Sequence, residues 1–128
     1  MTYYISRVLP GAAFDEAINR IVDALSDEGF GVLTEIDVRE TLKKKLDVDF
    51  RPYRILGACN PKMAYRALKA EDMIGTMLPC NVVVQDTGGG VEIAAIDPVA
   101  SMQAIENPNL GEVATKVRGM LQTVVENV

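Results

Sequence analysis

The segments YRILGACNP (Tyr53–Pro61) and LPCNVVV (Leu78–Val84) decide the fold of this chain. Each contains the dipeptide Cys-Asn where a run of strand-forming residues meets another kind of structure. Cys59-Asn60 closes the first run and is followed by proline, and Cys80-Asn81 opens the second run and is preceded by proline. These are the only two cysteines in 128 residues. We expect the rest of the chain to be a scaffold around these two Cys-Asn corners.

Outward from this centre, alternating and β-branched residues predict further strands. Residues 53–59 alternate between two faces, with Tyr53, Ile55, Gly57 and Cys59 pointing one way. The expected strands are residues 3–9, 30–38, 53–59, 81–85 and 91–96, and a glycine-rich hairpin at 86–90 joins the last two.

Helical spacing and capping residues predict the remaining elements. Asn60 followed by Pro61 is a favourable helix start, since asparagine caps the free N–H groups and proline fits the first turn. The same signal recurs at Asp97-Pro98. The expected helices are 14–29, 38–46 with a capping box at its start, 61–70, 98–105, and a last helix capped by Asn109 with Glu112. Residues 71–79 are expected to be a loop, although Met73, Ile74, Met77 and Leu78 make it apolar.

The element order alternates strands with helices and ends in two helices, which predicts a single α+β domain over residues 1–128. We expect a two-layer sandwich, with a mixed sheet of about five strands and the helices packed on one face. At this length the chain is able to bury a core without disulfides.

Composition excludes several classes of protein. The net charge is −5, which argues against a nucleic-acid partner. The chain has no histidine, so Ser-His-Asp and Cys-His relays and histidine metal sites are excluded, and two cysteines are too few for a four-thiolate zinc site. No signal peptide or membrane-spanning run is recognisable, and the cytoplasm is the expected location.

Cys59 and Cys80 are the first candidate site. Cys59 precedes a helix N-terminus, where the helix dipole favours a thiolate. If the strands at 53–59 and 81–85 are neighbours, the two cysteines could form a redox dithiol or a two-thiolate site for a soft ion such as Cu(I). They could equally be small buried core residues.

Asn60 and Asn81 could donate hydrogen bonds to a ligand. For Asn60, helix capping is a sufficient structural reason for an asparagine at this position. For Asn81 the sequence suggests no comparable structural role. The apolar segment from Met73 to Leu78 could be the wall of a pocket, part of a dimer interface, or a loop folded on its own core.

Basic residues near the first corner suggest an anion site, although a solvated helix face explains them as well. They are Arg51, Arg54, Lys62, Arg66 and Lys69. The three glycines at 88–90 are a turn rather than a phosphate loop, because a strand follows them.

The two segments and their surroundings resemble the domain of unknown function 302 family of small prokaryotic proteins. The resemblance implies an α+β fold, often as a homodimer, and it brings no established activity. It is carried by residues 53–61, 64–68, 74–75, 78–84 and 95–98.

These observations favour a cytoplasmic, homodimeric binding module, whose small-molecule or soft-metal site lies between the Cys-Asn corners. The expected ligand-binding residues are Cys59, Asn60, Cys80 and Asn81. One alternative is a thiol-dependent redox enzyme that uses Cys59 and Cys80, and another is a structural or interaction homodimer without a ligand. The sequence identifies neither a cofactor nor a substrate.

Overall fold

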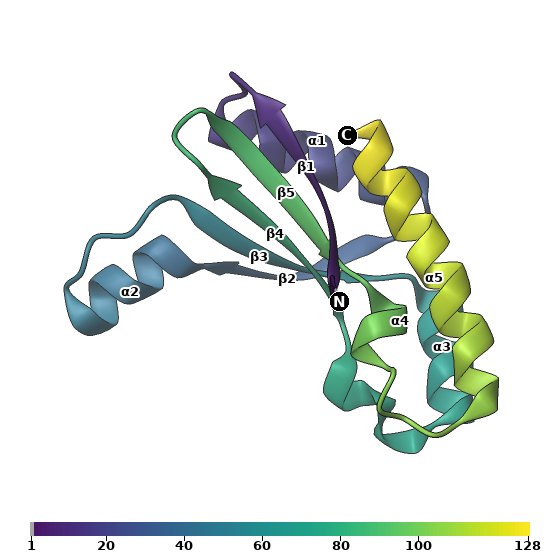
Figure 1. Ribbon diagram of the computed structural model, residues 1–128. Helices are drawn as coiled ribbons and strands as arrows, with labels where there is room; N and C mark the ends of the chain where they lie inside the picture. Colours follow the sequence, from purple (N-terminus) through teal and green to yellow (C-terminus); the bar gives the residue numbers. More distant parts are fainter. Residues whose placement is uncertain (1) are drawn as a thin grey trace.

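The computed structural model of the protein describes residues 2–128, which form one five-stranded sheet and a layer of helices (Figure 1). Four of the five strands expected from the sequence lie within one residue of their predicted bounds, and the strand Tyr53–Cys59 matches its prediction at both ends. The elements in chain order are β1 (Tyr4–Pro10), α1 (Phe14–Asp27), β2 (Gly31–Asp37), α2 (Val38–Leu46), β3 (Tyr53–Cys59), α3 (Pro61–Ala70), the 3-10 helix η1 (Asp72–Met77), β4 (Cys80–Asp86), β5 (Gly90–Ile96), α4 (Pro98–Ser101) and α5 (Pro108–Asn127).

The sheet has the strand order β1-β5-β4-β3-β2, and every neighbouring pair in the described chain is antiparallel. The predicted α+β sandwich is therefore confirmed, but the sheet is not mixed. A parallel pair needs a crossover that brings the chain back to the same end of the sheet. Here α2 joins β2 to β3, and α3 with η1 joins β3 to β4, as long hairpin connections. The strands on either side of α1 lie at opposite edges and do not pair.

The core lies between one face of the sheet and the two long helices α1 and α5, while α3 and α4 pack against α5. Alternate residues of the central strands point into this core, as the period of a strand requires. The fully buried sheet residues are Leu56, Ala58, Val82, Val84, Ile93 and Ala95. The helices contribute apolar stripes from Ala17 to Leu25 in α1 and from Leu110 to Val125 in α5.

Side-chain caps set three of the helix starts, as the sequence predicted. Asn60 Oδ1 accepts a hydrogen bond from the Met63 N–H at 3.3 Å, and Asp37 accepts one from the Glu40 N–H at 3.0 Å. Asp97 caps α4 through the N–H groups of Val99 and Ala100.

Three local predictions were wrong. Residues 71–79 are not wholly a loop, because η1 occupies most of them and places Ile74 in the core. The helix expected to reach residue 105 ends at Ser101, where the chain continues in successive tight turns. The last helix is capped by Asn107 instead of Asn109, because the proline at 108 supplies a better first helical residue than the residue after Asn109.

Helix α2 extends away from the rest of the molecule (Figure 1). None of its nine residues is buried, and its main contacts are with β2 and β3. We refer to residues 38–52, which comprise α2 and its return to β3, as the arm. Within the described residues, no helix has both the length and the apolar character to span a membrane.

Candidate functional site

Strands β3 and β4 pair so that the two Cys-Asn corners meet at one end of the sheet. Ala58 pairs with Cys80, and Gly57 pairs with Asn81. Cys59 therefore lies one residue beyond the partner of Cys80, diagonally across the two strands. The register confirms that β3 and β4 are neighbours and that both Cys-Asn corners lie at the same end of the sheet.

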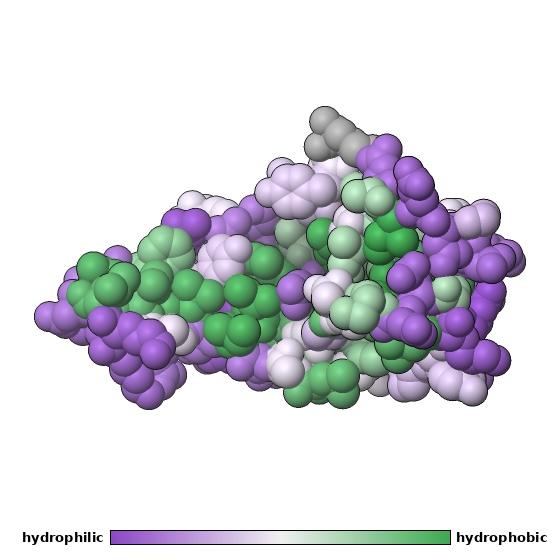
Figure 2. Space-filling model, turned by 90° about the horizontal axis from the view of Figure 1, so that it is seen from below, coloured by the Kyte–Doolittle hydropathy of each residue, from purple (hydrophilic) through white to green (hydrophobic). Residues whose placement is uncertain are grey.

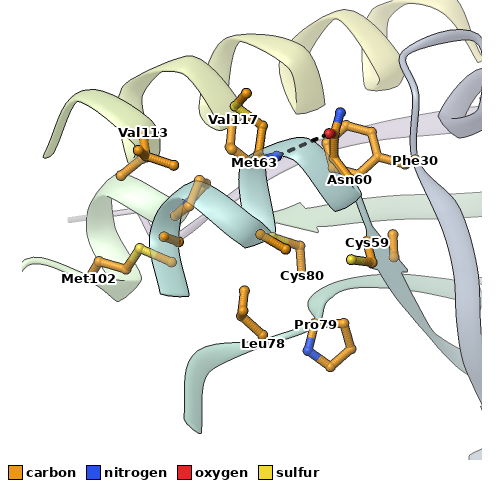
Figure 3. A pocket seen from close by; sticks show the side chains of 15 residues that line it. Phe30, Cys59, Asn60, Met63, Leu78, Pro79, Cys80, Met102, Val113 and Val117 are labelled. Carbon is orange, nitrogen blue, oxygen red and sulfur yellow. Dashed lines mark hydrogen bonds between the residues drawn. The ribbon is translucent and has the colours of Figure 1, made fainter. Parts of the chain in front are cut away.

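A small cavity of about 30 Å³ opens at this meeting point, between the sheet end, α3 and α5. Figure 3 shows the side chains gathered around it from both corners and from the helices. The described lining residues are largely apolar, and Asn60 carries the one amide side chain among them. The lining set is Phe30, Ala58, Cys59, Asn60, Met63, Ala64, Ala67, Leu78, Pro79, Cys80, Pro98, Met102, Val113, Ala114 and Val117.

Four sulfur-bearing side chains line this one cavity: the thiols of Cys59 and Cys80 and the thioethers of Met63 and Met102. They come from β3, β4, the first turn of α3 and the end of α4. We call them the sulfur cluster. Sequence reasoning missed both methionines. Met63 had a local signal, since it lies one helical turn after Cys59, but the arrival of Met102 depends on how α4 packs against α5.

Cys80 is held as a neutral thiol by its surroundings. Its side chain is 8% exposed. Burial, with a smaller contribution from the charge of a Cys59 thiolate, raises the pKa of Cys80 to about 11. The Cys59 thiol is half-buried, and neither cysteine forms a disulfide.

Both ends of the Asn60 side-chain amide form hydrogen bonds within the chain. Its oxygen caps α3, and its amide nitrogen donates to the Glu28 carbonyl oxygen at 3.3 Å, which ties the α1–β2 connection to the start of α3. The side chain thus closes one end of the cavity and holds two segments together. Structural hydrogen bonds, including the predicted helix cap, therefore account for both the oxygen and the nitrogen of the Asn60 amide.

Asn81 lies apart from the other three predicted ligand residues. Residues of β4 alternate between faces, so Asn81 points away from the buried Cys80 and toward the sheet face that carries no helix. It is exposed there, in a separate hollow of about 320 Å³ with Tyr4, Tyr53 and Gln85 among its lining residues. The structure brings together Cys59, Asn60 and Cys80, and it does not bring Asn81 to them.

The residues of the apolar segment from Met73 to Leu78 lie in different surroundings. Ile74 is fully buried, Leu78 lines the sulfur cavity, and Met73 is 68% exposed. Only the end of this segment therefore contributes a wall to the cavity.

The basic residues near the first corner do not converge. Lys62, Arg66 and Lys69 lie on the exposed side of α3, while Arg54 pairs with Glu35 at 2.8 Å. Among residues 2–128 there is also no group of three or more histidine, cysteine, aspartate or glutamate side chains able to hold a metal ion. Any metal site here would depend on the two thiols with the thioethers beside them.

A family profile described as a domain of unknown function, DUF302, matches residues 5–128. Among solved structures, the chain is similar to the crystal structure of the uncharacterized conserved protein DUF302 from Bacillus stearothermophilus, with a TM-score of 0.91 and 30% sequence identity. That similarity covers 99% of this chain and 98% of the other. No curated protein matches the chain. The matches confirm the α+β fold and the resemblance carried by the two corner segments.

Proposed function

This chain belongs to the DUF302 family of domains of unknown function, and we propose that it is a binding module for one soft metal ion. The ion would be Cu(I), held in the cavity by the thiolates of Cys59 and Cys80. The observation that carries this proposal is the sulfur cluster, in which both cysteines of the chain and two methionines line a single small cavity.

The size of the cavity favours an ion over a small organic molecule. Its volume of about 30 Å³ equals the space of about one water molecule, whereas pockets for organic ligands hold roughly 300–1,000 Å³. The two ligand classes expected from the sequence are therefore not equally well supported.

The chemistry of the lining favours a soft ion. Thiolate and thioether sulfur atoms select Cu(I), while Mg²⁺ and Ca²⁺ require oxygen ligands. The Asn60 oxygen is already engaged as a helix cap, and the remaining walls are apolar. Met63 and Met102 would supply additional weak ligands around a two-thiolate centre.

Binding would be coupled to proton release. The pKa of Cys80 is raised to about 11, so this thiol must lose its proton when it becomes a metal ligand near neutral pH. Loss of the Cys80 proton alone should make the apparent affinity for the ion increase about tenfold for each unit by which the pH is raised, up to that pKa.

The test is native mass spectrometry of the reduced protein after anaerobic addition of Cu(I), with Ag(I) as a redox-stable substitute. We expect one ion per chain in the wild type and none in Cys59→Ser or Cys80→Ser. Met102→Leu should weaken binding, whereas Met73→Leu is the matched control, because Met73 is exposed and outside the cavity.

Uptake of the ion by the double variant Cys59→Ser/Cys80→Ser to the same extent as by the wild type would overturn the proposal. The place of both cysteines at one cavity also favours a second candidate, a thiol redox role. Loss of two hydrogen atoms per chain on mild oxidation, in protein that takes up no metal, would assign that role instead.

A further inference from the structure

A second, larger hollow adjoins the sulfur cavity at the start of α3. Its volume is about 500 Å³, and residues from the end of α1, the first turn of α3 and the middle of α5 line it. Asn60 and Met63 line both spaces, so these two side chains lie between them. Figure 3 shows Asn60 and Met63 side by side at the sulfur cavity, joined by the hydrogen bond of the helix cap. We call this second space the outer hollow.

Thioether groups lead from the outer hollow to the sulfur cluster. Met120, on α5, is half-buried and lines the outer hollow but not the sulfur cavity. Its sulfur lies 4.0 Å from the amide nitrogen of Asn60. Met63 is 8% exposed and belongs to both spaces. Because thioether sulfur is a suitable ligand for Cu(I), an ion that enters from the outer hollow meets Met120 first, then Met63, and then the two thiols.

The outer hollow also carries charges of both signs. Lys62 and Lys116 supply ammonium groups, while Asp27 and Glu28 supply carboxylates. None of these four side chains forms an ion pair with another residue of 2–128. All four charges are therefore available to a ligand that has carboxylate and ammonium groups of its own.

The position and size of the outer hollow fit a charged organic molecule. Figure 2 shows hydrophilic side chains along the side of the molecule that carries α3 and α5, at the right, whereas apolar ones gather on α2, at the left. A volume of about 500 Å³ lies within the roughly 300–1,000 Å³ of sites for organic ligands.

The opposite side of the sulfur cavity offers no comparable site. A hollow of about 250 Å³ shares Met102 with the cavity there, but none of its described lining residues is charged. Of the two hollows beside the cavity, the outer hollow is therefore the one that can hold a charged molecule.

We propose that the outer hollow binds the carrier that delivers Cu(I) to the sulfur cluster, a small thiol of the amino-acid or short-peptide type. The lysines hold the carboxylates of this carrier, and Asp27 and Glu28 hold its ammonium group. The carrier's sulfur, with the ion bound to it, then faces Met120 and Met63. This inference rests on the proposed Cu(I) site and adds the donor from which that site is filled.

Transfer of the ion is an exchange of thiolate ligands without a redox step. Two bonds from Cu(I) to carrier sulfur atoms break, and two bonds to the sulfur atoms of Cys59 and Cys80 form. The protons of the two cysteine thiols pass to the two carrier thiolates, which leave as thiols. Copper remains Cu(I) throughout, so the exchange needs neither an oxidant nor a reductant.

The test compares two carriers that bind Cu(I) through the same type of atom, glutathione and 2-mercaptoethanol. Glutathione has carboxylates and an ammonium group, whereas 2-mercaptoethanol has neither. After anaerobic mixing, native mass spectrometry measures how fast the ion appears on the reduced protein. In Lys62→Glu/Lys116→Glu the rate of loading from glutathione should fall about tenfold, and the rate from 2-mercaptoethanol should stay unchanged. Lys69→Glu makes the same change of charge at the other end of α3 and should load as the wild type does.

Met120→Leu separates passage of the ion from binding of the carrier. This variant should load more slowly from both carriers by a similar factor, with the same final occupancy as the wild type. Loading at the wild-type rate would refute the passage past Met120. Equal effects of the double lysine substitution on both carriers, or no effect on either, would overturn the binding of a charged carrier. A wild type that takes up no ion from either carrier, or from Cu(I) added in acetonitrile, would refute the metal site itself and this inference with it.

Discussion

At the scale of single residues, the meeting of the two corners depends on one glycine and one buried thiol. A side chain at Gly57 would contact Thr34 and would lie 2.7 Å from the Pro79 ring, so glycine is what allows Pro79 to approach β3. Pro79 precedes Cys80, which pairs with Ala58, the residue before Cys59. In this arrangement the Cys80 thiol is buried and loses contact with water.

The raised pKa of Cys80 makes stability depend on pH in the alkaline range. Below its ordinary value of 9.0, both the folded and the unfolded chain keep the proton, and Cys80 contributes no pH dependence. Between that pH and about 11 the unfolded chain ionises first, so the free energy of unfolding should fall with rising pH by about 2–3 kcal/mol in total. Urea unfolding of the wild type and Cys80→Ser at pH 8 and pH 11 measures this difference. Parallel pH profiles for the two proteins would contradict it.

At the scale of elements, the sequence predicts what local chemistry determines. Asn60 and Asp97 were recognised as caps because each is followed by proline, and both caps are confirmed. The antiparallel pairing of β3 with β4 was not predictable from either strand alone, since pairing joins segments that are distant in the sequence. The same reason hid Met102 from the site, because its place depends on the packing of α4 against α5.

Asp97 links two helices and should matter more than an ordinary cap. Its oxygens accept from the Val99 N–H at 2.9 Å and from Arg118 Nε on α5, also at 2.9 Å. Burial by itself would raise the pKa of Asp97, but the bonds from Arg118 and the backbone outweigh it and hold the pKa below its usual range. We expect Asp97→Ala to lower the free energy of unfolding by about 1–3 kcal/mol.

The sign of the pH effect at Asp97 follows from its lowered pKa. Its contribution is complete above the ordinary value of 3.8 and is lost as the pH falls through the lower folded value. Asp97→Asn keeps an acceptor for the cap and should show a smaller loss at neutral pH, with no acid dependence from this position. Chemical denaturation of the three proteins between pH 2 and pH 7 tests both statements. Equal stability of Asp97→Ala and the wild type would refute the linking role.

At the scale of the whole molecule, the two faces of the sheet differ in what covers them. One face packs on α1 and α5 and forms the core, and we call the opposite face, which carries neither of these helices, the open face. Sequence patterns predicted the core face well, because a core leaves a clear periodicity. They did not distinguish the open face from it, since apolar positions on the open face look like further core positions in β3, β4 and β5.

Two neighbouring valines in β4 point to opposite faces of the sheet, so substitutions at these positions test the two faces separately. Val84 is fully buried in the core, whereas Val83 faces the open side. Val84→Thr places a hydroxyl in the core and should cost about 1–3 kcal/mol of stability. Val83→Thr should leave the stability nearly unchanged, because this side chain lies outside the core. Urea unfolding of both variants distinguishes them, and equal loss of stability would show that the open face belongs to the core.

The edges of the sheet carry a further consequence. The outer strands are β1 and β2, and β2 is interrupted by a bulge between Val32 and Thr34, while β1 ends in Pro10, which has no N–H to offer. Bulges and prolines discourage the addition of new strands at a sheet edge. The two edges therefore offer a poor template to a strand from a second molecule. At high concentration the protein should resist growth into fibres by strand addition.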